Sequence, residues 1–136
     1  MSLISQKVRV TDMPSMTWKS IRLELARTRE FPEGSASRAY LMRLPLDEEG
    51  LIDEQALGAS PAMATVHRFW PNEPDKSGYV IRTPGGWAMS YEPGESDDET
   101  LFHLETHPIR IGEYVTLTEP DGRQLPFRVA SLKQLN

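Results

Sequence analysis

The sequence contains no cysteine and no long apolar run. Without cysteine there are no disulfides, thiolate metal sites, cysteine nucleophiles or thiol redox switches. No stretch approaches the roughly 18 consecutive apolar residues of a membrane-spanning helix. The first ten residues also lack the apolar segment of a secretion signal. We therefore expect a cytoplasmic protein that does not enter the membrane.

Positive charge is scarce as well. The chain has 15 Lys and Arg against 20 Asp and Glu, for a net charge of −5. Proteins that bind nucleic acid without specificity hold phosphates with clustered cations, so this balance argues against such a partner. Aromatic rings beside arginines can stack single-stranded bases. On that ground Arg27, Arg38, Trp70 and Trp87 remain a third hypothesis, as a single-stranded nucleic-acid site.

Eleven prolines leave little room for helices, because a proline inside a helix removes a backbone donor. One open window contains Ile21, Leu23 and Leu25, which alternate with charged residues in the period of a half-buried strand. A helix over residues 18–29 is the alternative, since the residues there have good helix propensity. We favour the strand.

The second open window, residues 46–60, predicts only a short helical turn. Asp53 is a suitable N-cap, and Gly58 is expected to stop the turn.

The rest of the chain is typical of short strands joined by turns. Residues 84–87 (PGGW) and 119–122 (EPDG) are expected to form tight hairpin turns. We predict a mainly β fold, a small antiparallel β-barrel or sandwich of about seven to nine short strands with at most one or two short helical turns. Residues 1–136 would form a single compact domain. Strand-forming residues are concentrated at 38–44, 64–70, 79–83, 87–91, 101–106, 113–118 and 126–132.

The three histidines are the only candidate metal ligands of their type. On a strand, His103, Glu105 and His107 would share one face, but the two histidines would lie roughly 13 Å apart. One zinc ion cannot bridge that distance with bonds of about 2 Å. His67 from another strand would have to complete a site with His103 and Glu105. We favour a polar strand surface, and a metal-dependent hydrolase that uses these four residues is the alternative.

The segment EFPEGSASR at residues 30–38 combines small hydroxyl residues with nearby arginines. A guanidinium group presents a planar fork of donors to a carboxylate or phosphate, so this segment is the best candidate for an anion site. Trp70 and Trp87 stand at strand ends and are the rings that we expect to face a ligand. The candidate anion-binding residues are Arg27, Arg29, Ser35, Ser37, Arg38 and Arg43.

No catalytic arrangement emerges from the sequence. It has no G-x-S-x-G elbow, and its serines have no evident base. We expect a noncatalytic β module without a cofactor. Its partner would be an unknown protein or a small anionic molecule, bound through the loops.

Overall fold

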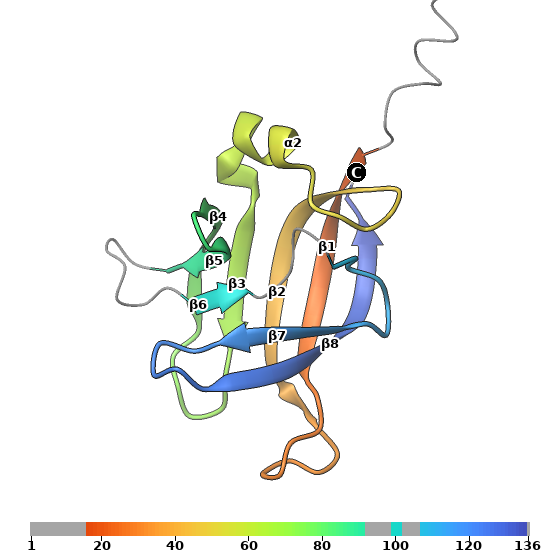
Figure 1. Cartoon of the computed structure of the whole chain (residues 1–136). Coiled ribbons are helices and arrows are strands. Elements are labelled where there is room, and N and C mark those ends of the chain that lie inside the picture. Colours follow the sequence, from red (N-terminus) through yellow and green to blue (C-terminus); the bar gives the residue numbers. More distant parts are fainter. Residues whose placement is uncertain (1–15, 92–98, 102–106, 136) are drawn as a thin grey trace, which may run out of the picture.

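The computed structural model describes residues 16–91, 99–101 and 107–135. Within these residues, eight antiparallel strands pair in chain order, and β8 returns to pair with β1, which closes a barrel (Figure 1). The predicted mainly β fold is confirmed, as a barrel. The strands are β1 (Met16–Leu25), β2 (Ser35–Asp47), β3 (Thr65–Phe69), β4 (Lys76–Thr83), β5 (Gly86–Ser90), β6 (Glu99–Leu101), β7 (Tyr114–Thr118) and β8 (Gln124–Gln134).

The local predictions for strands and turns can be followed along this order. Residues 18–25 lie in β1, so the strand interpretation of 18–29 is confirmed over most of that segment. The turn after β7 has the expected hydrogen bond, from the Gly122 N–H to the Glu119 carbonyl at 2.8 Å, and Gly122 has φ +90°. Thr83 pairs with Gly86 across the other tight turn. Of the strand expected at 101–106, the structure describes only Leu101, in β6.

A short helix, α2 (Glu54–Ala59), is followed by a 3₁₀ turn, η1 (Pro61–Met63). Asp53 caps α2 as predicted, because its Oδ1 accepts a hydrogen bond from the Ala56 N–H at 3.0 Å. The prediction that Gly58 stops the helix is wrong, since the helix continues through it to Ala59. Pro61 explains the later end, because a proline disfavours helical geometry in the residue before it.

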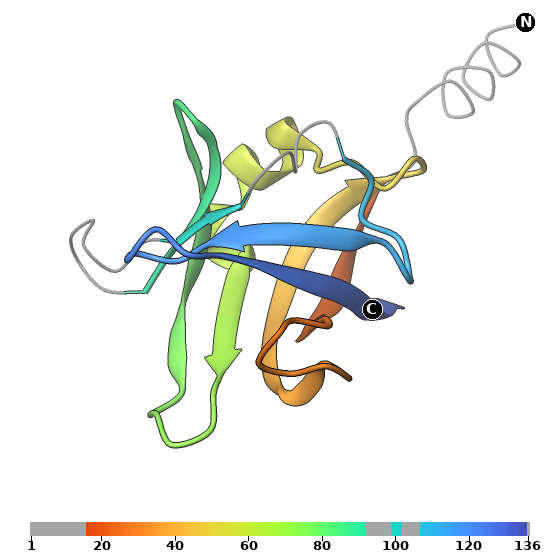
Figure 2. The same cartoon turned by 60° about the horizontal axis from the view of Figure 1, so that its bottom comes forward.

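The core fills the barrel, and along β1 it is formed by alternate residues, Ile21, Leu23 and Leu25, all buried. Helix α2 lies at one end of the barrel, and the loop of residues 26–34 lies at the other (Figure 1). Figure 2, turned by 60°, shows the connection from β3 to β4 at the same end as this loop. Among the described residues, no helix has the length and apolar character to cross a membrane.

Candidate functional site

The barrel end opposite α2 carries charged side chains on the inward faces of the strands. On β2, Arg38 is in phase with the buried Tyr40 and Met42, and on β3, Arg68 is in phase with the buried Val66. Glu119 and Arg123 approach the same end from the turn between β7 and β8. We call this region, defined by Arg38, Arg68, Trp70, Glu119 and Arg123, the barrel mouth.

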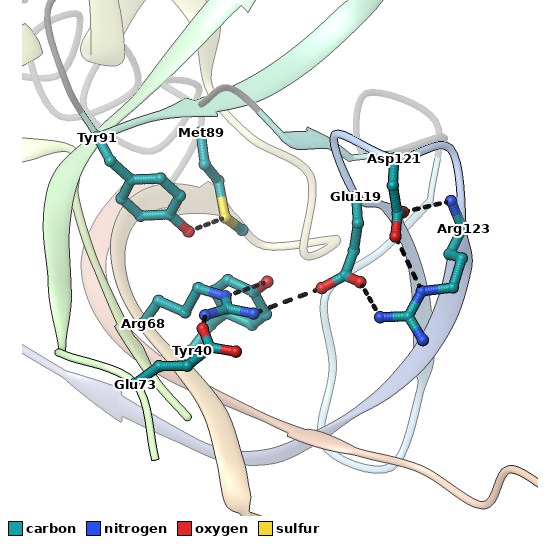
Figure 3. Close-up of polar contacts among 8 residues, drawn as sticks. All are labelled: Tyr40, Arg68, Glu73, Met89, Tyr91, Glu119, Asp121 and Arg123. Carbon is teal, nitrogen blue, oxygen red and sulfur yellow. Dashed lines mark hydrogen bonds and ion pairs between the residues drawn. The ribbon is translucent and has the colours of Figure 1, made fainter. Parts of the chain in front are cut away.

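Arg68 is the centre of a buried polar network at the barrel mouth (Figure 3). Its side chain is 8% exposed and donates hydrogen bonds to Tyr40 Oη at 3.2 Å and Glu73 Oε1 at 2.9 Å. It also donates to Glu119 Oε2 at 3.4 Å. The guanidinium carbon lies 4.1 Å from the centre of the Trp70 ring. These contacts hold the indole of Trp70 in place, because the cation packs against its face.

Glu119 links this buried network to the surface. Its side chain is 9% exposed, and its second carboxylate oxygen accepts a hydrogen bond from Arg123 Nη2 at 2.8 Å. Arg123 Nε also donates to Asp121 Oδ2 at 3.2 Å. The nearby negative charge of Glu119, followed by that of Asp121, raises the pKa of Arg123. The charge of Arg123 is therefore already balanced by carboxylates of the protein.

Beside this network lies a cavity of about 260 Å³, which we call the mouth pocket. It lies between the 26–34 loop and the turn that joins β7 to β8. Three of the residues expected to bind a ligand, Arg29, Arg38 and Trp70, lie together in its wall. The full lining is Leu25, Thr28, Arg29, Glu30, Phe31, Arg38, Trp70, Arg123 and Leu125.

Arg38 reaches the mouth pocket because β2 is irregular where it begins. Glu24 pairs with Ala39, whereas the next residue of β1 pairs with Ser35, so residues 36–38 are extra on β2. Such bulges redirect side chains. The Arg38 guanidinium lies 4.1 Å from the centre of the Phe31 ring and 5.8 Å from that of Trp70. Its Nη1 donates to Ser35 Oγ at 3.1 Å.

Neither Arg38 nor Arg29 forms an ion pair with any carboxylate of the described residues. Arg38 is nevertheless held in position by Phe31, Trp70 and Ser35. A fixed guanidinium without a protein carboxylate leaves charged donors for an anion that comes from solution.

The 26–34 loop that carries Phe31 is fixed by its own hydrogen bonds. The Thr28 N–H donates to the Phe31 carbonyl, and the Phe31 N–H donates to Thr28 Oγ1, both at 2.9 Å. Gly34 has φ +77°, and a Cβ at this position would lie 2.7 Å from the Leu25 carbonyl oxygen. Only glycine suits this position. These contacts fix the loop that forms one wall of the mouth pocket.

Several expected ligand-binding residues lie elsewhere. Arg27 and Ser35 line a separate polar hollow of about 300 Å³, together with Arg128. Ser37 is exposed and lies 3.2 Å from Ser35, between the two hydroxyl oxygens. Arg43 is exposed on β2, opposite Ser20.

Trp87 is not a ligand-facing ring, which corrects the expectation from its place at a strand end. It is 1% exposed and belongs to the core. The guanidinium of Arg82 lies 5.3 Å from the centre of its ring, and Arg82 pairs with Glu54 of α2 at 3.5 Å. Trp87 therefore lies at the α2 end of the barrel. Of the four residues considered for single-stranded nucleic acid, only Arg38 and Trp70 line the mouth pocket.

The histidines give no metal centre in the part of the chain that the structure describes. His67 is exposed on β3, where its Nδ1 lies 2.9 Å from Ser77 Oγ. His107 lies in the connection before β7, not on a strand as expected. His103 and Glu105 fall outside the described residues. Residues 16–91, 99–101 and 107–135 contain no group of three His, Cys, Asp or Glu side chains that could hold a metal ion.

The barrel mouth and its pocket also contain four residues that were not expected from the sequence: Phe31, Arg68, Glu119 and Arg123. A signal existed for Arg68, because it continues the alternation of Ala64 and Val66, so its side chain had to point into the barrel. For Arg123 the hairpin was predicted, but nothing in the sequence shows that the turn lies beside the 26–34 loop.

No family model matches the sequence, and no similar protein is found among curated proteins or solved structures. Thr28 has the only hydroxyl group among the residues that line the mouth pocket, and its oxygen accepts a hydrogen bond from the loop backbone. No histidine lines the pocket that could activate this hydroxyl as a nucleophile. The arrangement is suited to holding a ligand.

Proposed function

We propose that the protein is a noncatalytic binding module whose ligand is a small anion held in the mouth pocket. Arg38 would bind the charged group of the ligand, and Arg29 would add a second, more exposed cation. Phe31 and Trp70 would contact the remainder of the molecule. We place the protein in the cytoplasm as part of this proposal.

The observation that supports the proposal is that Arg38 is fixed in the pocket wall without a carboxylate partner among the described residues. It lines a cavity, two aromatic rings and a serine fix its position, and it has no carboxylate partner in the described parts of the chain. Arginines that serve only structure are usually satisfied by protein acceptors, as Arg68 is by Glu73 and Glu119. Arg38 keeps donors for an acceptor that the protein does not supply.

Isothermal titration calorimetry with sodium benzoate and with inorganic phosphate, at low ionic strength, tests the proposal. We expect at least one of the two to bind with a dissociation constant between about 10 µM and 1 mM, as suits a ligand of few atoms. Arg38→Gln should weaken binding about ten- to a hundredfold, because a charged hydrogen bond contributes about 1.5–3 kcal/mol. Arg38→Lys should give an intermediate affinity, since it keeps the charge but loses the planar fork.

Arg43→Gln is the matched control, because Arg43 is an exposed arginine of the same strand that does not line the pocket. We expect its affinity to equal that of the wild type. Failure of both anions to bind, or equal binding by Arg38→Gln and the wild type, would show that the proposal is wrong.

A further inference from the structure

We infer that the ligand of the mouth pocket is an aromatic monocarboxylate, that is, one aromatic ring that bears a single carboxylate group. This inference rests on the proposed function, and it specifies the shape and the charge of the ligand. It follows from the size of the cavity, the nature of its walls and the number of charges that the protein leaves unbalanced there.

The size of the mouth pocket indicates a ligand larger than a simple ion. A water molecule takes about 30 Å³ of the liquid, so an ion of four or five heavy atoms would occupy at most about 120–150 Å³. The cavity measures about 260 Å³ and would be only about half filled. It is also slightly smaller than the roughly 300 Å³ at which pockets for drug-sized molecules begin. One ring with a short acidic group suits this volume.

The walls indicate what the body of the ligand is made of. Leu25, Phe31, Trp70 and Leu125 give the cavity an apolar lining that a hydrated ion would not use. Two of these four side chains, Phe31 and Trp70, are aromatic. An aromatic ring of the ligand that packs against them would gain attraction beyond that from its buried area. A flat ring can also stack on the guanidinium plane of Arg38.

The charges indicate a single negative group. Arg123 is balanced by Glu119 and Asp121, so Arg29 and Arg38 are the guanidinium groups of the lining that lack a carboxylate partner among the described residues. Glu30 also lines the pocket and opposes one of these two charges. Of the three charged lining residues outside the Arg68–Glu119–Arg123 network, Arg29, Arg38 and Glu30, one positive charge is in excess, and a carboxylate matches it. A phosphate monoester, with about −1.5 to −2 charges at pH 7, would exceed it.

A set of matched probes tests the inference, and calorimetry or NMR titration measures each dissociation constant. Benzoate should bind about two- to tenfold tighter than cyclohexanecarboxylate, which has the same charge and nearly the same size but no aromatic ring. Acetate should bind at least tenfold more weakly than benzoate, because it leaves the apolar walls unfilled. Benzamide, which has the ring but no charge, should also bind at least tenfold more weakly. Phenyl phosphate should bind no tighter than benzoate.

Phe31→Leu is the variant that isolates the aromatic contribution. It keeps an apolar wall on the surface loop but removes one ring, so the ratio of the benzoate to the cyclohexanecarboxylate affinity should fall, while the acetate affinity changes less than the benzoate affinity. Trp70→Leu should have the same effect, and a far-ultraviolet circular dichroism spectrum of the β type with a cooperative thermal transition would show that either variant keeps the fold.

The outcomes separate this inference from the proposed function. If cyclohexanecarboxylate or acetate binds as tightly as benzoate while Arg38→Gln still weakens them all, anion binding stands and the aromatic inference is overturned. Tighter binding of phenyl phosphate or inorganic phosphate than of benzoate overturns the single-carboxylate part. If no probe binds, both fail.

Discussion

Replacing Glu119 by leucine should destabilise the protein by about 3 kcal/mol, because it takes from the buried cation of Arg68 one of the two carboxylates that pair with it among the described residues. The side chains of Arg68 and Glu119 are 8% and 9% exposed. Breaking a buried ion pair on one side typically costs about 3–5 kcal/mol. We expect the lower end of that range, since Glu73 still neutralises Arg68 from 2.9 Å. Urea unfolding measures the change.

A thermal scan should show the same loss as a melting temperature lowered by about 10 °C, for a domain of this size. The matched control is Glu54→Leu, which breaks an exposed ion pair with Arg82. We expect it to cost less than about 1 kcal/mol.

The double variant Arg68→Met/Glu119→Leu sharpens the test. It removes both buried charges, and the partners that remain, Glu73 and Arg123, are 48% and 59% exposed and can be solvated. We therefore expect the double variant to be more stable than Glu119→Leu alone, because apolar side chains replace a buried pair at little net cost. A cost below about 1 kcal/mol for Glu119→Leu, or a double variant less stable than that single one, would refute the reasoning.

Three further predictions concern the stability of the barrel, measured by urea unfolding. Gly78→Ala should cost about 2 kcal/mol or more, because a Cβ there would meet the Ser90 carbonyl oxygen and lie 2.7 Å from the Tyr91 Cα. A Cβ at Gly58 of α2 would meet open space, so Gly58→Ala should instead stabilise the protein by about 0.5–1 kcal/mol. Equal effects of the two changes would count against the close packing of β4 on β5. Tyr40→Phe should cost about 1 kcal/mol, since Arg68 loses a buried acceptor, and a neutral result would show that this hydrogen bond contributes nothing.

The fold was predictable from local features of the sequence. The alternation of Ile21, Leu23 and Leu25 shows which face of β1 is buried, and the proline and glycine of 119–122 specify the turn without help from distant residues. Where a local rule failed, at Gly58, the next constraint along the chain, Pro61, decided the end of the helix.

The mouth pocket was predictable only in part, because it depends on contacts between distant segments. Arg38 and Trp70 could be chosen by residue type, but their meeting depends on the bulge of β2 and on the order of the strands. Trp70 and Trp87 are alike in sequence, since both stand at strand ends. The difference is that Ile52, Leu57 and Ile109 are buried at the end of the barrel that holds Trp87.

The most direct test of the central claim is an NMR titration of the isotope-labelled protein with benzoate, which follows the side-chain N–H signals of arginine and tryptophan. Because Arg38 and Trp70 line the mouth pocket whereas Arg43 and Trp87 do not, saturable shifts should appear for the first two and be absent for the others. Shifts confined to Arg43, or to Arg82 in the apolar hollow beside α2, would contradict the claim, and so would the absence of any shift.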